Sequence, residues 1–155
     1  MARASEWLRG RRDFCEAAFS FLIADFGYRR CLRRFTDGGF QIGYLGPGAG
    51  VLAEWLPRDT VTAWLLPLSP GEVPANWGSP GGPRGYDLGL LVLLAGEGTQ
   101  VSDRSMYTPT DDVITAVAHQ LRSKGQGMLR GDYSVVPAVQ DLIRSRAGYP
   151  GQDPG

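Results

Sequence analysis

Residues 40–56 read FQIGYLGPGAGVLAEWL, and this stretch decides the predicted fold. Phe40, Ile42 and Tyr44 stand at alternate positions, which is the two-residue period of a half-buried strand. The segment 46–50 interrupts the alternation, and residues 51–56 form a second strand candidate. A P-loop would need a lysine after the glycines and then a helix. Because no lysine follows and the next segment is a strand candidate, the glycines predict a hairpin turn.

Two more strand candidates flank this hairpin. Residues 28–35 precede it across the turn-like segment 36–39, and residues 60–66 follow it across the short segment 57–59. Parallel neighbours need crossover connections of about a dozen residues or more, so connections this short require antiparallel pairing. We therefore expect a four-stranded antiparallel meander.

An amphipathic pattern ahead of the meander predicts an N-terminal helix over residues 11–26. Its apolar stripe is so wide that we expect the helix to be covered on most sides or laid against the sheet. Gly27 is suited to end it in the left-handed conformation. The stripe consists of Phe14, Ala17, Ala18, Phe21 and Leu22, widened by Cys15, Phe19, Ile23 and Phe26.

Two helices are predicted near the C-terminal end. The first covers residues 110–124, where Thr110 can cap the helix and Asp111 and Asp112 favour the first turn. The second covers residues 133–146, with Asp132 as N-cap and Pro137 in the first turn, where proline is tolerated. The expected buried side chains are Val113, Ala116, Val117 and Leu121 in the first helix and Val136, Val139, Leu142 and Ile143 in the second.

The order of these elements, an N-terminal helix, four strands and C-terminal helices, predicts an α+β fold. Residues 86–95 fit either a helix or a fifth strand, and their leucine content favours the helix. We expect one domain over residues 1–147, with a long Pro/Gly loop at 67–85 and a flexible tail at 148–155.

Composition narrows the functional classes. The 155 residues are 43% hydrophobic and 21% charged, with no net charge, which is ordinary for a globular protein and unlike a dedicated nucleic-acid binder.

Eight of the sixteen basic residues precede residue 35, and an edge strand protected by charge explains Arg29, Arg30, Arg33 and Arg34 better than nucleic-acid contact. If residues 28–35 form a regular strand, Arg29 and Arg33 share one face and Arg30 and Arg34 the other. The longest apolar run, 88–95, is too short to span a bilayer, so we expect a cytoplasmic protein without membrane contact.

No motif names a reaction, a metal or a cofactor. His119 is the only histidine and reads better as a solvated side chain than as a catalytic base for Cys15 or Cys31. The two cysteines could form a disulfide but are not required to. One histidine and two cysteines match no zinc spacing. A pair of carboxylates assembled in space stays open as a catalytic arrangement.

Trp77, Arg84 and Tyr86 are the candidate partner-binding residues. Trp7, Trp55 and Trp64 fall on or beside predicted elements, where core packing explains them, whereas Trp77 lies within the Pro/Gly loop. Tryptophan, tyrosine and arginine are enriched at binding hot spots. The alternative, that Trp77 attaches its own loop to the body, has equal weight.

Three short strings carry a resemblance to a known group of proteins: Phe26-Gly27-Tyr28, Tyr86-Asp87-Leu88 and the segment 129–134, Leu-Arg-Gly-Asp-Tyr-Ser. Over residues 11–146 the chain resembles small bacterial α+β proteins, some of them similar to immunity proteins of toxin–immunity pairs. The resemblance implies a protein that binds and inhibits a partner protein. A small-ligand binder or enzyme with a cleft beneath the 67–85 loop is the alternative.

Overall fold

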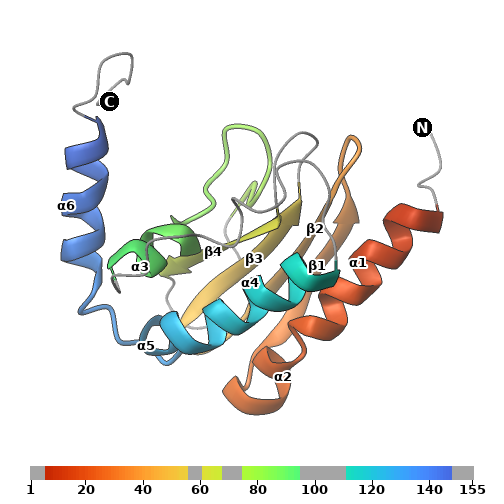
Figure 1. The fold of residues 1–155 in the computed structure, drawn as a ribbon, viewed down its shortest axis with the longest axis horizontal. Coiled ribbons are helices and arrows are strands. Elements are labelled where there is room, and N and C mark those ends of the chain that lie inside the picture. Colours follow the sequence, from red (N-terminus) through yellow and green to blue (C-terminus); the bar gives the residue numbers. More distant parts are fainter. Residues whose placement is uncertain (1–5, 56–60, 68–74, 95–110, 148–155) are drawn as a thin grey trace.

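A computed structural model describes residues 6–55, 61–67, 75–94 and 111–147. The chain forms a five-stranded antiparallel sheet with helices packed on it, so the predicted α+β class is confirmed (Figure 1). The predicted tail at 148–155, the capping residue Thr110 and residues 68–74 of the long loop lie outside the described residues. The elements are α1 (Glu6–Ala18), α2 (Phe21–Phe26), β1 (Arg29–Phe35), β2 (Phe40–Leu45), β3 (Ala49–Trp55), β4 (Val61–Pro67), β5 (Tyr86–Asp87), α3 (Leu88–Leu94), α4 (Asp111–Lys124), α5 (Gln126–Leu129) and α6 (Val136–Ala147).

The strands follow one another across the sheet in the order β1-β2-β3-β4-β5. The four-stranded meander is therefore confirmed, and the two-residue β5 extends it. The sequence left a helix or a fifth strand open for residues 86–95, and the structure contains both. Tyr86 and Asp87 pair with β4, and a helix begins at Leu88. The Asp87 carboxylate accepts the backbone N–H of Gly89 at 2.9 Å and thereby caps that helix.

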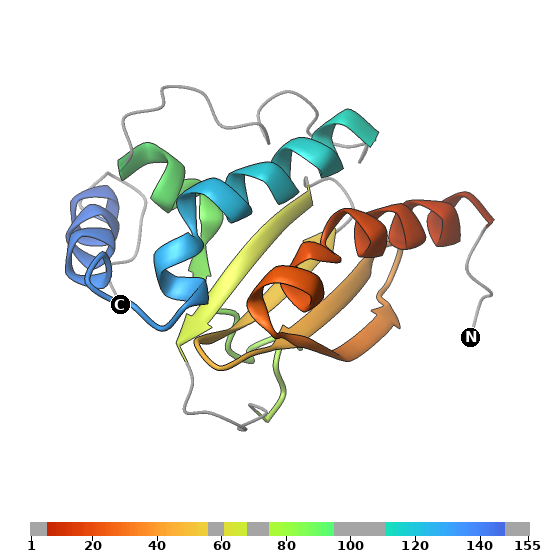
Figure 2. The same ribbon diagram turned by 90° about the horizontal axis from the view of Figure 1, so that it is seen from below.

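The sheet has two differently covered faces. Figure 2 shows α1, α2 and α4 on one side, which we call the helix face, and the segment 75–85 on the other, which we call the loop face. The alternation that predicted the strands places fully buried apolar side chains on the helix face. Burial of each of the larger ones contributes roughly 1.5–3 kcal/mol to the stability of the fold. The buried side chains of this face include Phe40, Ile42, Tyr44, Val51, Ala53, Val61, Ala63 and Leu65.

The predicted helix over residues 11–26 is two helices. The chain turns at Phe19 and Ser20, where the Ser20 hydroxyl donates to the carbonyl oxygen of Ala17 at 2.7 Å. Cys15, Phe19 and Leu22 are fully buried, whereas Phe14, Ala18 and Phe21 are only partly buried and Ala17 is exposed. These last four residues line a groove beside α4. Gly27 ends α2 with φ of 75°, as predicted.

The C-terminal helices agree with the prediction in part. Val113, Val117 and Leu121 of α4 are buried as expected. The short helix α5 was not predicted. The last helix begins at Val136 and not at 133, because the carboxylate of Asp132 accepts the backbone N–H of Ser134 in a local turn that precedes the helix. These hydrogen bonds from Ser134 hold the pKa of Asp132 below its usual value.

The three tryptophans predicted to pack in the core differ in how deeply they lie. Trp55 is buried, but Trp7 is 51% exposed, so the prediction that core packing explains Trp7 is wrong. Trp7 stands at the first turn of α1, and its ring meets the edge of Trp55 with ring centroids 5.7 Å apart. Trp64 is partly buried on β4.

The glycine-rich segment 46–50 contains the β2–β3 turn, so the hairpin prediction is confirmed. Its glycines are needed because other groups lie against them. A Cβ atom at Gly46 would come within 2.3 Å of the Tyr28 ring, and one at Gly48 within 2.5 Å of backbone atoms of Leu129 and Gly131. The buried Tyr28 hydroxyl donates to the carbonyl oxygen of Leu129 at 2.8 Å, which joins the start of β1 to the end of α5. Burial raises the pKa of this hydroxyl.

This crowding generates a first prediction. Gly48→Ala should lower the free energy of unfolding by about 1–3 kcal/mol, the usual cost of overpacking, because the obstructing atoms belong to the backbone and cannot rotate away. Gly10→Ala is the matched control: nothing lies within 4 Å of the added carbon, and the position is within α1. Urea denaturation of both variants measures the effect, and equal stability of Gly48→Ala and wild type would contradict this account.

Candidate functional site

Trp77 is buried between the Pro/Gly loop and the sheet, with only 4% of its surface exposed. Its indole lies against Gly43 of β2, where a Cβ atom would meet the ring at 2.8 Å. The missing side chain at position 43 therefore provides the space that the indole occupies. This geometry favours the alternative in which Trp77 attaches its loop to the body. Its partner-binding role remains a prediction without structural support.

Arg84 joins a row of polar side chains on the loop face, which we call the polar row: Arg34, Gln41, Glu54 and Arg84. The Arg84 guanidinium binds both carboxylate oxygens of Glu54, at 3.0 and 3.1 Å, and Glu54 is only 2% exposed. Gln41 donates to Glu54 and, at 2.7 Å, to the Gly78 carbonyl oxygen. Hydrogen bonding to Glu54 raises the pKa of Arg84.

Arg34 completes the polar row from β1. It donates to the side-chain oxygen of Gln41 at 2.6 Å and to the carbonyl oxygen of Trp77 at 3.0 Å. A buried carboxylate is tolerated only when it is paired and hydrogen-bonded, and the polar row meets that requirement for Glu54. The row therefore connects the loop to β1, β2 and β3 and has a structural role.

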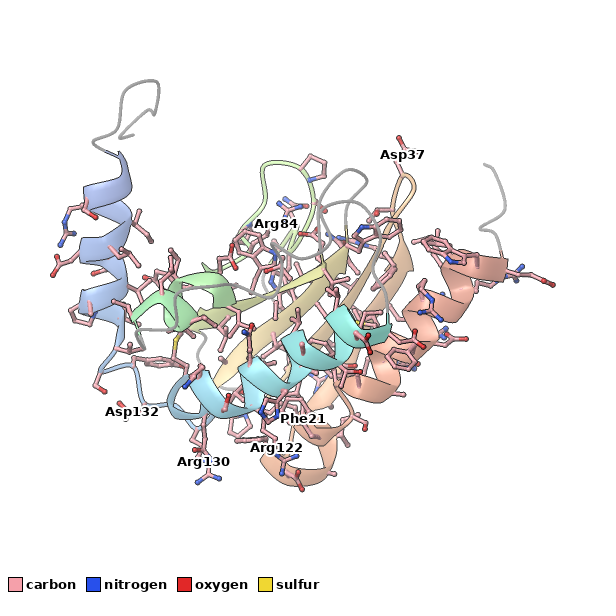
Figure 3. The ribbon with its side chains drawn as sticks, viewed as in Figure 1. Phe21, Asp37, Arg84, Arg122, Arg130 and Asp132 are labelled. Atoms are coloured by element: carbon pink, nitrogen blue, oxygen red, sulfur yellow. The ribbon has the colours of Figure 1, made fainter. Side chains whose placement is uncertain are left out.

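Tyr86 is directed away from the other two candidate residues. It pairs with Leu65, whose side chain belongs to the helix face, and its hydroxyl accepts a hydrogen bond from Gln140 of α6 at 3.2 Å. Trp77 and Arg84 lie on the loop face, so the structure does not bring the three predicted residues together. Figure 3 shows Arg84 beside the segment 75–85, which Figure 2 places on the side of the sheet away from α4.

The arginines of β1 are mostly neutralised within the chain. The predicted edge position of this strand is confirmed, but the predicted pairing of faces is wrong, because a β-bulge between Arg30 and Leu32 shifts the alternation by one residue. Arg30 and Arg33 consequently share the helix face, where both form ion pairs with Glu16 of α1. Arg33 also binds Asp13 at 2.8 Å. These contacts favour the charged-edge interpretation over nucleic-acid contact.

The two thiols and the histidine lie in different environments. Cys15 and Cys31 are both free. Burial, aided by the nearby Glu16 charge, raises the pKa of Cys15, and burial also raises the pKa of Cys31. Because the thiolate is the reactive form, Cys15 is poorly suited to be a nucleophile. His119 is exposed on the outer side of α4, so it does not approach the buried Cys15.

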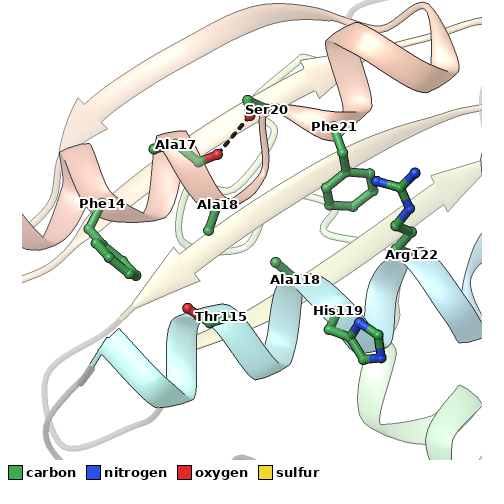
Figure 4. Close-up of a pocket in the computed structure, with 9 residues that line it drawn as sticks. All are labelled: Phe14, Ala17, Ala18, Ser20, Phe21, Thr115, Ala118, His119 and Arg122. Carbon is green, nitrogen blue, oxygen red and sulfur yellow. Dashed lines mark hydrogen bonds between the residues drawn. The ribbon is translucent and has the colours of Figure 1, made fainter.

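A groove of about 480 Å³ lies between α1, α2 and α4, and we call it the interhelical groove. Figure 4 shows Phe14 near one end and Phe21 near the other, with small side chains between them. Ser20, Thr115 and His119 contribute polar atoms at its rim. The lining residues are Phe14, Ala17, Ala18, Ser20, Phe21, Thr115, Ala118, His119 and Arg122.

An arginine and an aspartate close the interhelical groove at each end. Arg11 of α1 forms an ion pair with Asp111 of α4, and its guanidinium lies 5.6 Å from the centroid of the Phe14 ring. At the other end, Arg122 of α4 binds Asp25 of α2 at 2.7 Å and lies 5.4 Å from the centroid of the Phe21 ring. These two contacts connect α1 and α2 to α4.

Sequence reasoning missed this groove. Phe14, Ala17, Ala18 and Phe21 were assigned to a core-facing stripe, since a single continuous helix would place them toward the sheet. The available signal is a set of small residues, Ala17, Ala18, Thr115 and Ala118, on two helices. These residues indicate a groove only when the two helices are known to be neighbours.

The polar row generates a second prediction. Arg84→Ala removes both hydrogen bonds to Glu54 and leaves a buried carboxylate with Gln41 as its remaining partner. We expect the free energy of unfolding to fall by about 1.5–3 kcal/mol, the usual contribution of hydrogen bonds to a charged group. Arg29→Ala, an exposed arginine of β1, is the control and should change stability by less than about 0.5 kcal/mol. Equal losses in urea denaturation would contradict the structural role of Arg84.

The thiol environments generate a third prediction. In the native protein, Ellman's reagent should modify Cys31 slowly and leave Cys15 unmodified, whereas both should react rapidly in denaturant. The variants Cys15→Ser and Cys31→Ser assign the reacting thiol. Rapid native modification of Cys15 would show that α1 opens from the sheet or that the thiol is activated.

Within the described parts of the chain, no three His, Cys, Asp or Glu side chains converge as a metal site would require. None of the described helices is long and apolar enough to cross a membrane. Comparison with protein-family models, curated proteins and solved structures gives no match for this chain.

Proposed function

We propose that this chain is a protein-binding domain and that the interhelical groove is its binding surface. The observation that carries the proposal is a groove at the molecular surface with an alanine-rich floor, an aromatic ring near each end and a polar rim. Grooves of this kind receive the apolar side chains of a partner segment, as in the binding of amphipathic helices.

The anchoring of the groove helices to the sheet supports this function. α1 and α4 each bury a set of side chains against the sheet, among them Cys15 and Leu121, and the two arginine–aspartate pairs connect the helices. A surface that is already in its binding conformation loses little side-chain and backbone entropy on association. Inhibition of a partner protein, the role implied by the resemblance to immunity proteins, is one activity that such a surface would serve.

Binding of a small ligand is the second candidate function. The volume of about 480 Å³ falls within the range of about 300–1,000 Å³ typical of ligand sites, and Ser20, Thr115 and His119 supply a few polar groups. The expected location beneath the 67–85 loop is less favoured, because Trp77 and Arg84 fill the space between the described part of that loop and the sheet.

The fourth prediction tests both functions. Ala17→Trp places a large side chain at an exposed position that lines the groove, so it should obstruct the groove without disturbing the core. Ala138→Trp, on the exposed side of α6, is the matched control. After affinity capture of the tagged protein from its native cells identifies a partner, calorimetry should give at least about tenfold weaker binding for Ala17→Trp and unchanged binding for Ala138→Trp.

The outcomes separate the two candidates. Equal partner affinity of both variants would show that the groove is not the binding surface. If a thermal-shift screen of metabolites finds a compound that stabilises the wild type and Ala138→Trp but not Ala17→Trp, and no protein partner depends on Ala17, the small-ligand function replaces the protein-binding one.

A further inference from the structure

Two arginines lie over two phenylalanine rings at the α2 end of the interhelical groove. Phe21 and Phe26 meet edge to face, with ring centroids 6.0 Å apart. Arg122 of α4 lies over Phe21 and Arg130, next to α5, lies over Phe26, each 5.4 Å from the ring centroid. Figure 3 shows Phe21, Arg122 and Arg130 at the same end of the molecule. We call these four residues the arginine–aromatic cluster.

The cluster combines apolar surface with oriented cations. Ile23 of the same short helix is 51% exposed, and Phe21 and Phe26 are partly exposed. Contact with the ring face restricts each guanidinium to a limited range of orientations, which reduces the entropy lost when it binds a carboxylate through two parallel hydrogen bonds. Aromatic residues, including phenylalanine, and arginine are enriched at protein interfaces.

The two guanidiniums of the cluster differ in their ion pairing. Asp25 neutralises Arg122 at 2.7 Å. Arg130 is exposed, and among the described residues no carboxylate lies within ion-pair distance of it. Asp132 is close in sequence, but its carboxylate accepts the backbone N–H of Ser134 at 3.0 Å. Arg130 therefore offers an unused site for an acidic group at the end of the groove.

We propose that the protein segment received by the interhelical groove is an acidic amphipathic helix. Its apolar side chains occupy the groove between Phe14 and Phe21, and its aspartate or glutamate side chains bind Arg130 and share Arg122 with Asp25. This inference rests on the proposed function, because it names the chemistry of the partner at that same groove.

Two other anionic partners fit the observations less well. A nucleic acid would need several available cations in an extended track, whereas Arg30, Arg33 and Arg34 are occupied by Glu16, Asp13 and Gln41. An anionic membrane would need a longer apolar face than the six residues of α2, which also include the acidic Asp25. An acidic protein segment needs only the apolar groove and one or two oriented guanidiniums.

The experiment uses two synthetic helical peptides with identical leucine positions and with either glutamate or lysine at every polar position. Binding to the full-length protein is measured by fluorescence anisotropy and located by amide chemical-shift changes. The glutamate peptide should bind at least about tenfold more tightly than the lysine peptide, with shifts at Ile23 and Arg130. Arg130→Glu should abolish that preference, and Arg9→Glu, an exposed charge reversal on α1, should leave it intact.

Several results would overturn the inference: equal affinity of the two peptides, no binding of either, a preference that survives Arg130→Glu, or tighter binding to vesicles of phosphatidylcholine and phosphatidylserine than to the glutamate peptide. Ala17→Trp separates this failure from failure of the proposed function. If Ala17→Trp weakens both peptides equally, the groove binds protein segments without charge selection. If it weakens neither peptide and no native partner, the groove itself is not a binding surface.

Discussion

All residues of β2 and β3 are buried, so the central sheet must be covered on both faces. The helix face meets this requirement with apolar side chains under α1, α2 and α4. The loop face carries Gln41 and Glu54, which cannot be covered by apolar groups without a large desolvation cost. Arg84 and the carbonyl oxygens of the loop supply the missing hydrogen-bond partners. The loop is therefore as necessary to the sheet as the helices are, although it contains no regular secondary structure along most of its described length.

The interhelical groove follows from the same requirement. α1 and α4 are fixed by the side chains that they bury against the sheet, so the residues on their outer flanks are free to be small. Ala17, Ala18 and Ala118 leave space between the helices, and the Arg11–Asp111 and Arg122–Asp25 pairs connect the helices beside it. The groove is thus a consequence of how the two helices pack on the sheet.

Much of the fold could be predicted from local sequence patterns. Alternating residues such as Phe40, Ile42 and Tyr44 predicted the strands, and the short connections between strands fixed the antiparallel order. The predictions fail where a local irregularity changes the direction of the side chains that follow it. The bulge near Cys31 reverses which arginines share a face, and the turn at Ser20 rotates α2 relative to α1. The sequence around Cys31 and Ser20 shows no distinctive pattern, because the bulge and the turn depend on contacts that exist only in the folded chain.

The candidate site could be predicted even less well. Trp77 was a reasonable hot-spot candidate because tryptophan in a Pro/Gly loop is consistent with either a binding or a packing role. Only the position of Gly43, which is 34 residues earlier in the chain, decides between them. The groove poses the same difficulty, since Ala17 and Ala118 are distant in sequence and become neighbours only through their separate contacts with the sheet.

The packing of Trp77 on Gly43 also determines when the loop can attach during folding. The space for the indole is bordered by β2 and by Leu32 of β1, so it exists only after these two strands have paired. We therefore expect the loop to attach after these strands have paired, because the contact is non-local. The indole passes from water to a buried site in this step. In a variant that keeps Trp77 and replaces Trp7, Trp55 and Trp64 by phenylalanine, its fluorescence would distinguish assembly of the sheet from closure of the loop over it.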